Sequence, residues 1–195
     1  MTVNIKTSAI TDQLVIQSGG TLTFQNNRDL TNEDGAGNDL VNNGTIILGN
    51  GSLFLINTNA VYINTGSVSI TANNSELMTV SSAQINNFGT ITSSRTITNN
   101  GLLTNSGTIT SSDVFTNTGI INNSGTLTNS GNINNTGTYS NTAGSTYIHN
   151  QNGGFIPTAT WAATSNCNVT GVIDVMPTGF NQTFGNLTWN CSGQT

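Results

Sequence analysis

Four acidic residues lie close together in one short stretch and could bind a metal ion. Asp29, Glu33, Asp34 and Asp39 fall within the segment RDLTNEDGAGND, which also contains glycine. Ca²⁺ takes six to eight oxygen ligands, and a glycine-containing loop rich in carboxylates and amides can supply them. The spacing of these acids does not follow the EF-hand pattern. They therefore form a calcium candidate, and a solvated surface loop is the alternative interpretation.

The other ionisable residues do not form a recognisable catalytic set. Enzymes that cleave polysaccharides need a pair of carboxylates, or a basic residue in a cleft. Asp12, Glu76, Asp113 and Asp174 are scattered along the chain without basic residues beside them. His149 is the only histidine, and we expect it at the surface or at a corner of the chain. The sequence predicts that the protein is not an enzyme and, apart from the calcium candidate, has no cofactor.

The two cysteines, Cys167 and Cys191, could form one disulfide bond. They have neither CxxC nor Cys/His metal-ligand spacing, and an even number of cysteines in a chain of extracellular character fits a disulfide. A pair of free, stacked thiols is the alternative. We predict the disulfide because the composition is typical of a secreted protein.

Charge excludes two classes of partner. Only 6% of the 195 residues are charged, the net charge is −5, and the basic residues are Lys6, Arg28 and Arg95. Binding to a phosphate backbone needs clustered lysine and arginine, so we expect no nucleic-acid partner. No apolar run approaches the roughly 20 residues that a membrane-spanning helix needs. No signal peptide opens the sequence, and we expect it to be a fragment of a longer extracellular or cell-surface protein.

A six-residue repeat dominates the middle of the chain. An apolar residue recurs at every sixth position: Ile85, Ile91, Ile97, Leu103, Ile109, Phe115, Ile121, Leu127, Ile133 and Tyr139. Asn or Ser follows two positions after each, and Gly precedes most of them by two, which gives the unit G-x-Φ-x-N-x with Φ apolar. A period of six does not fit a helix, but it is a multiple of two and fits a short strand with a corner. We expect glycine and asparagine to supply positive φ at these corners.

The number of repeats in each turn of the chain can also be predicted. The segment TITSSR at residues 90–95 is echoed by TITSSD at residues 108–113. A coil of three repeats would stack Arg95 on Asp113, the two charged residues that replace the corner glycine, and would let them form an ion pair. The fold class predicted is therefore all-β: a parallel β-solenoid with three-sided coils of about 18 residues. Regular coils are expected at 85–142, irregular coils at 1–84, and a wider continuation or a small β cap at 143–195.

The three-sided coil predicts two kinds of stacked side chains. Inward asparagines should form amide ladders that satisfy their buried polar groups; these residues are Asn99, Asn117, Asn135, Asn105, Asn123 and Asn141. Outward threonines should form a flat double file; these residues are Thr90, Thr92, Thr108, Thr110, Thr126 and Thr128. We expect this file to cover three coils and to stop at Ser145. Threonine is also a favourable outward residue on any strand, which is the alternative interpretation of the file.

Several segments resemble known families. The units GLLTNS, GTITSS, GIINNS, GTLTNS and GNINNT resemble repeats of filamentous-haemagglutinin-type bacterial surface proteins. The stretches FIPTATW, NLTWNCSGQT and GGTLTF are similar to segments of large repeat proteins secreted by Bacteroidetes. The threonine file resembles that of insect β-solenoid antifreeze proteins, in which it implies ice binding.

These resemblances imply three alternative functions. The first is an extracellular structural or adhesive rod that contacts neighbouring solenoid segments, a glycan or another surface, or assembles end to end into a filament, because an open sheet edge can template another chain. The second is ice binding through the threonine file. The third is a β-helix that binds or degrades polysaccharide.

Overall fold

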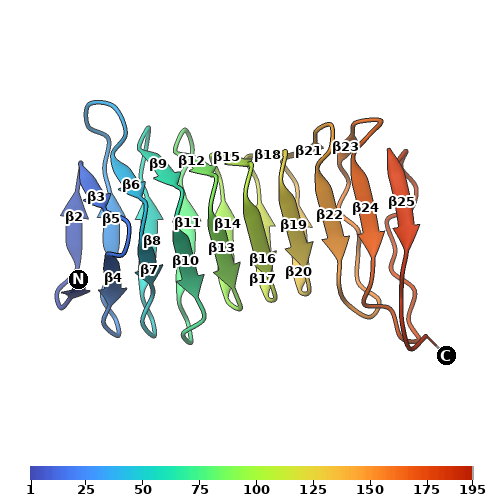
Figure 1. Ribbon diagram of the computed structural model, residues 1–195, viewed down its shortest axis with the longest axis horizontal. Helices are drawn as coiled ribbons and strands as arrows, with labels where there is room; N and C mark the ends of the chain where they lie inside the picture. The colour runs from blue at the N-terminus through green and yellow to red at the C-terminus, as the bar shows by residue number, and fades with distance from the viewer. Residues whose placement is uncertain (195) are drawn as a thin grey trace.

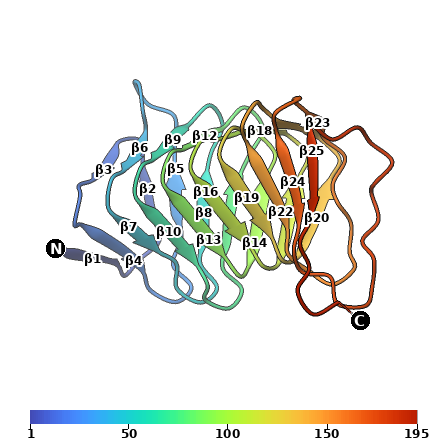
Figure 2. The ribbon, with the colours of Figure 1, turned by 45° about the vertical axis from the view of Figure 1, so that its right-hand side comes forward.

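The chain forms a rod of stacked coils, with its N- and C-termini at opposite ends (Figure 1). The computed structural model describes residues 1–194 and contains about 9 turns of a parallel β-solenoid. Three parallel sheets run along the rod, and each sheet receives its strands from successive turns. Seen obliquely, the coils wind about one common axis (Figure 2). The predicted all-β, three-sided solenoid is confirmed.

The three sheets, called A, B and C below, divide the strands as follows. Sheet A contains β1 (Thr2–Ile5), β4 (Thr21–Phe24), β7 (Thr45–Ile47), β10 (Ser67–Ile70), β13 (Thr90–Ser93), β16 (Thr108–Ser111), β19 (Thr126–Asn129), β22 (Thr146–His149), β24 (Asn166–Val169) and β25 (Asn186–Trp189). Sheet B contains β2 (Ala9–Thr11), β5 (Leu30–Asn32), β8 (Leu53–Ile56), β11 (Glu76–Thr79), β14 (Thr96–Asn99), β17 (Val114–Asn117) and β20 (Asn132–Asn135). Sheet C contains β3 (Leu14–Ile16), β6 (Leu40–Asn42), β9 (Val61–Asn64), β12 (Gln84–Asn87), β15 (Leu102–Asn105), β18 (Ile120–Asn123), β21 (Thr138–Asn141) and β23 (Thr160–Trp161).

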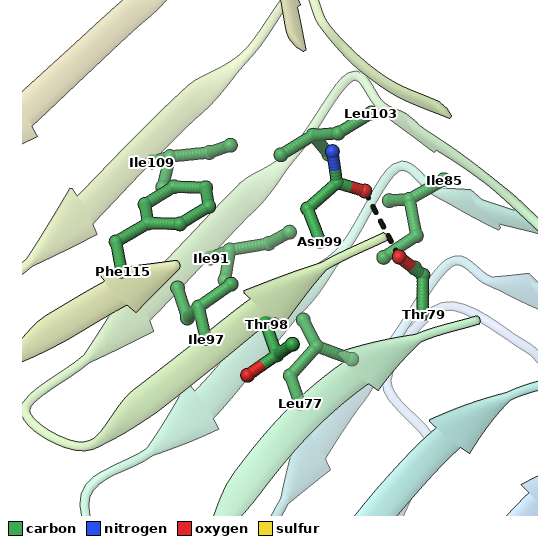
Figure 3. Close-up of a pocket in the computed structure, with 10 residues that line it drawn as sticks. All are labelled: Leu77, Thr79, Ile85, Ile91, Ile97, Thr98, Asn99, Leu103, Ile109 and Phe115. Atoms are coloured by element: carbon green, nitrogen blue, oxygen red, sulfur yellow. Dashed lines mark hydrogen bonds between the residues drawn. The ribbon is translucent and has the colours of Figure 1, made fainter. Parts of the chain in front are cut away.

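Most strands bury every second residue, because successive side chains of a strand point to opposite faces. In β16, for example, Ile109 and Ser111 are buried, whereas Thr108 and Thr110 are partly exposed. The buried apolar residues stack into one continuous column along the axis. Figure 3 shows part of this column, where Ile91 of sheet A and Ile97 and Phe115 of sheet B converge. The core therefore has the width of one coil and the length of the rod.

Coil length differs along the chain. Asn42 and Asn64, which stack in sheet C, are separated by 22 residues, and the next pair is separated by 23. Between Asn87 and Asn141 each coil takes 18 residues. In the last part of the chain, Asn166 stacks on Asn186 with a separation of 20 residues. The extra residues lie outside the strands, and sheet A continues through coils of all these lengths.

Close packing, and not positive φ, explains the corner glycines of the regular coils. Glycines with positive φ are found elsewhere, for example Gly19 and Gly51, and the glycines of the six-residue repeat are not among them. At Gly119, an added Cβ atom would lie 2.1 Å from the carbonyl oxygen of Gly101 in the preceding coil. The expectation that these glycines supply positive φ is therefore wrong. They are needed because the backbones of adjacent coils touch at the corner.

Aromatic side chains fill the coils of the C-terminal region. The ring centroids of Tyr139 and Tyr147 lie 6.2 Å apart, and those of Tyr147 and Trp161 lie 6.1 Å apart. Trp161 then packs against Phe184 with 5.0 Å between ring centroids. Sheet A continues through this region as β22, β24 and β25, whereas within the described residues sheet B ends at β20 and sheet C at β23. Large rings occupy the wider bore that the longer coils create.

Candidate functional site

The outer face of sheet A carries two files of small polar side chains. Parallel pairing in register places one residue of each strand in the same file. The first file, here called file 1, is Thr2, Thr21, Thr45, Ser67, Thr90, Thr108, Thr126, Thr146, Asn166 and Asn186. The second, file 2, is Asn4, Thr23, Ile47, Ser69, Thr92, Thr110, Thr128, Ile148, Asn168 and Thr188.

File 1 therefore extends much further than the sequence predicted. The six predicted threonines do lie together on β13, β16 and β19, where Thr108 pairs with both Thr90 and Thr126. The prediction that Ser145 ends the file is wrong, because Ser145 is buried and Thr146 takes the outward position. File 2 is interrupted by Ile47 and Ile148. Every residue of file 1 is Thr, Ser or Asn, and all ten strands of sheet A contribute to it.

The outer faces of sheets B and C differ from sheet A. The outward positions of sheet B include Leu53, Met78 and the charged Glu76. Those of sheet C include Leu102 and Ile120, and Ile120 is 44% exposed. The files of sheet A contain no charged residue. Among the three faces, only sheet A thus has an unbroken line of hydroxyl and amide groups.

Hydrogen-bonded asparagines lie directly behind these faces and hold the coils in register. In sheet C the Nδ2 of each asparagine donates to the Oδ1 of the next, over distances of 2.7–2.9 Å. This ladder consists of Asn42, Asn64, Asn87, Asn105, Asn123 and Asn141, so it includes two residues, Asn42 and Asn64, that lie outside the regular repeat. In sheet B, Thr79 donates to Asn99 (Figure 3), and the ladder continues through Asn117 to Asn135. Buried amides bonded at both ends stabilise the stack.

The four acids of the calcium candidate are not brought together. Asp39 is buried, and its carboxylate accepts hydrogen bonds from the backbone N–H groups of Gly35 and Val61, each at 2.7 Å. Both carboxylate oxygens of Glu33 accept from Asn57, and Asp29 accepts from the backbone of the next coil. In residues 1–194, no group of three or more acidic, histidine or cysteine side chains has a metal-binding arrangement. Asp29, Glu33 and Asp39 therefore form hydrogen bonds between neighbouring coils.

Both cysteines are free thiols, so the predicted disulfide is absent. Cys167 points into the core opposite Leu187 of the next coil, whereas Cys191 lies four residues beyond Leu187 along the chain. The Sγ of Cys191 instead contacts the carbonyl oxygen of Val169 at 3.4 Å. Burial raises the pKa of the Cys167 thiol to about 12, which leaves it protonated and unreactive at neutral pH.

His149 is buried, which differs from the surface or corner position expected from the sequence. It occupies the inward position of β22 and stacks between Asn129 and Val169. Its Nε2 lies 2.7 Å from the carbonyl oxygen of Gly153 and therefore carries the proton. Its Nδ1 is without a hydrogen-bond partner among the described residues. Burial lowers the pKa of His149 below its ordinary value, and the hydrogen bond to Gly153 offsets this partly.

Arg95 and Asp113 lie in one hollow but do not form the predicted ion pair in the described part of the chain. The guanidinium of Arg95 turns toward the preceding coil, where Nε donates to the carbonyl of Ala72 at 3.2 Å and Nη2 donates to Asn73. Nη1 donates to the carbonyl of Ser94 at 2.9 Å. Asp113 and Arg95 both line a polar hollow at the corner between sheets A and B. The carbonyl oxygen of Ala72 and the side chain of Asn73, both on the wider preceding corner, therefore hold the guanidinium away from Asp113.

Comparisons with protein-family models, curated proteins and solved structures found no match to this chain. Over residues 1–194, the structure contains no helix long and apolar enough to cross a membrane. The geometry of the chain itself is thus the basis for the functional proposals that follow.

Proposed function

We propose that this chain is an extracellular, non-enzymatic structural rod that adheres to extended surfaces through the outer face of sheet A. The observation that carries the proposal is file 1, an uncharged line of hydroxyl and amide groups that runs over all ten strands of sheet A. The resemblance of the repeats to bacterial secreted surface proteins supports an extracellular location.

The rigidity of the rod favours adhesion to a regular surface. Neighbouring coils of a parallel sheet repeat every ~4.8 Å, and alternate residues of a strand are ~6.7 Å apart. Threonine is β-branched, so its χ1 angle is restricted before any surface is bound. The asparagine ladder of sheet C also donates to the backbone carbonyls of Thr108 and Thr126 in file 1, and so helps to hold the spacing of the files. A pre-ordered array loses little conformational entropy on binding, which increases affinity.

Adhesion can be measured on films of insoluble polysaccharide, such as cellulose and chitin, with a quartz crystal microbalance. The wild-type chain should bind, and Thr108→Tyr should reduce the bound mass severalfold because a large ring in file 1 lifts the face from the surface. Thr104→Tyr, a matched change on the outer face of sheet C, should bind like the wild type. Equal binding of all three proteins would show that sheet A is not the adhesive face.

Ice is a second candidate surface, favoured by the double threonine file on β13, β16 and β19. In these three strands, file 1 and file 2 consist only of threonine, which gives a two-dimensional array of hydroxyl and methyl groups. We expect thermal hysteresis in the wild-type chain and in Thr104→Tyr, and none in Thr108→Tyr. A wild-type chain that neither shows hysteresis nor shapes ice crystals would eliminate ice as the surface.

A further inference from the structure

We propose that the corner between sheets A and B contains a binding site for a neutral oligosaccharide, separate from the adhesive face of sheet A. The site is a notch where the corners of three successive coils are shorter than those beside them. Its polar lining and two unusual charged residues indicate the ligand class.

The notch arises from a change in corner length along the rod. The corner that follows β10 spans residues 71–75, whereas the corners after β13, β16 and β19 contain only two residues each. After β22 the chain again makes a wide excursion, beginning at residue 150. In Figure 1, the lower edge of the rod is correspondingly recessed below β13, β16 and β19. Three coils give the floor of the notch a length of about 14 Å along the axis.

A polar hollow occupies the N-terminal side of this notch. It is lined mainly by Asn73, Asn74, Glu76, Arg95, Thr96 and Asp113. The overhanging corner supplies Asn73 and Asn74, and the short corners supply Arg95 and Asp113. Asn74 has a positive φ of 54°, a conformation that asparagine tolerates better than most residues. The wall of the hollow is therefore built from amides and its floor from charged groups.

The two floor residues depart from the repeat at the same place. The six-residue repeat has glycine at this position, as at Gly131 in the same corner of the next coil. At Gly131, an added Cβ atom would lie 2.3 Å from the carbonyl oxygen of Asp113, so side chains are disfavoured where short corners stack. Arg95 and Asp113 are charged exceptions, and both point into one hollow. Charged side chains at two stacked corner positions that share one hollow indicate a role for these side chains.

The available hydrogen-bonding groups fit a neutral polyhydroxylated ligand. Arg95 is fixed by three acceptors and has further N–H groups to donate. Glu76 accepts a 2.6 Å hydrogen bond from Thr98 through one carboxylate oxygen, which leaves its other oxygen available. Donors and acceptors thus lie side by side, and the hydroxyl groups of a sugar can both donate and accept. Two carboxylates disfavour an anion, and the guanidinium disfavours a cation.

The test uses the full chain with cellohexaose, maltohexaose and mannohexaose in saturation-transfer NMR and calorimetry. Arg95→Gly and Asp113→Gly introduce the residue that Gly131 supplies at the same corner of the next coil, so both variants should fold, as circular dichroism and thermal unfolding can verify. At least one oligosaccharide should bind the wild type, and each variant should bind it at least about tenfold more weakly. Asp34→Gly removes an exposed acid elsewhere and should bind like the wild type.

Three results would overturn the proposal: no binding of any of the oligosaccharides, unchanged affinity in both glycine variants, or binding that disappears with EDTA. The last result would indicate a cation held by Glu76 and Asp113. Thr108→Tyr on sheet A should leave oligosaccharide binding unchanged, so failure of this site is distinguishable from failure of the proposed adhesive face.

Discussion

The buried asparagines illustrate how much the fold depends on single side chains. Asn105 accepts a 2.7 Å hydrogen bond from Asn87 and donates a 2.8 Å bond to Asn123. Its Nδ2 also lies 3.0 Å from the carbonyl oxygen of Thr126. One amide therefore connects three coils and a corner.

Replacement of Asn105 with alanine should destabilise the rod by about 3 kcal/mol, because it creates a small cavity and leaves polar atoms of Asn87 and Asn123 without partners. Urea unfolding followed by circular dichroism measures the change. Thr104→Ala on the same strand, an outward position, should change the free energy of unfolding by less than about 0.5 kcal/mol. Equal effects of the two substitutions would contradict a stabilising ladder.

His149 should make stability depend on pH. Burial lowers its pKa in the folded state, whereas the unfolded side chain titrates near its ordinary value of 6.5. Below that value the unfolded state binds the proton more readily than the folded state. The contribution of His149 to the free energy of unfolding is therefore fully present above pH 6.5, and it decreases as the pH falls toward the folded-state pKa. The slope for one proton is at most about 1.4 kcal/mol per pH unit.

The measurement compares urea midpoints at pH 7.5 and pH 5.5 for the wild type and for His149→Asn. Asparagine occupies the same inward position in the preceding coil, at Asn129, and it does not titrate. The variant should therefore lose the additional pH dependence. An equal decrease of the urea midpoint in both proteins would show that groups other than His149 cause the pH dependence.

At the residue scale, the sequence identified side chains in the regular repeat more accurately than those outside it. The ladder residues Asn99, Asn117 and Asn123 could be predicted because coils of constant length place equivalent residues 18 apart. Asn42 and Asn64 belong to the same kind of ladder, but longer coils hide their register. The disulfide was predicted from the extracellular character of the chain and the even number of cysteines. Neither observation gives the position of Cys191 relative to Cys167 in the coils.

At the scale of strands and corners, the corner controls the spacing of the coils. The strands have nearly constant length, whereas the corners between sheets A and B range from two residues after β13 to five after β10. A short corner brings the backbones of adjacent coils into contact, and glycine occupies most of these corners, with Arg95 and Asp113 as exceptions. The sequence showed where these glycines are, but steric contact between coils cannot be deduced from one repeat alone.

Gly119→Ala tests this interpretation of the corner. The new Cβ atom would approach the carbonyl oxygen of Gly101 to 2.1 Å unless the coils separate, so we expect a loss of at least about 2 kcal/mol in the free energy of unfolding. Thr118→Ala, an exposed neighbour in the same corner, should cost less than about 1 kcal/mol. A Gly119→Ala variant as stable as the wild type would show that the corner can relax without cost.

At the scale of the whole molecule, stability spreads from coil to coil. Each strand pairs with strands of the adjacent coils, and the core and ladders cross the same boundaries. The sequence predicted this architecture because a repeat that cannot bury its apolar residues alone must stack on its neighbours. The continuity of file 1 through coils of unequal length could not be predicted, since it depends on strand register and not on a fixed period.

The two ends of the described chain present core positions to solvent. Val3 of β1 is inward-facing but 48% exposed, and Leu187 of β25 is inward-facing but 47% exposed. Both strands are edges of sheet A and point in the same direction. An exposed edge can pair with another chain, and a head-to-tail contact of this kind does not close on itself. We therefore propose end-to-end association of second copies or of neighbouring solenoid segments through these edges.

Electron microscopy of the purified 195-residue chain in dilute neutral buffer should show filaments made of rods joined end to end. Val3→Lys and Leu187→Lys should each abolish the filaments, because a lysine at a stacked core position would bury an unpaired charge. Ile120→Lys places the same charge on an exposed outward position in the middle of the rod and should leave the filaments intact. Isolated rods in the wild-type sample would show that the ends do not associate on their own. Filaments that persist in both end variants would indicate lateral contacts between the faces, for which sheet A and its uncharged files are the first surface to mutate.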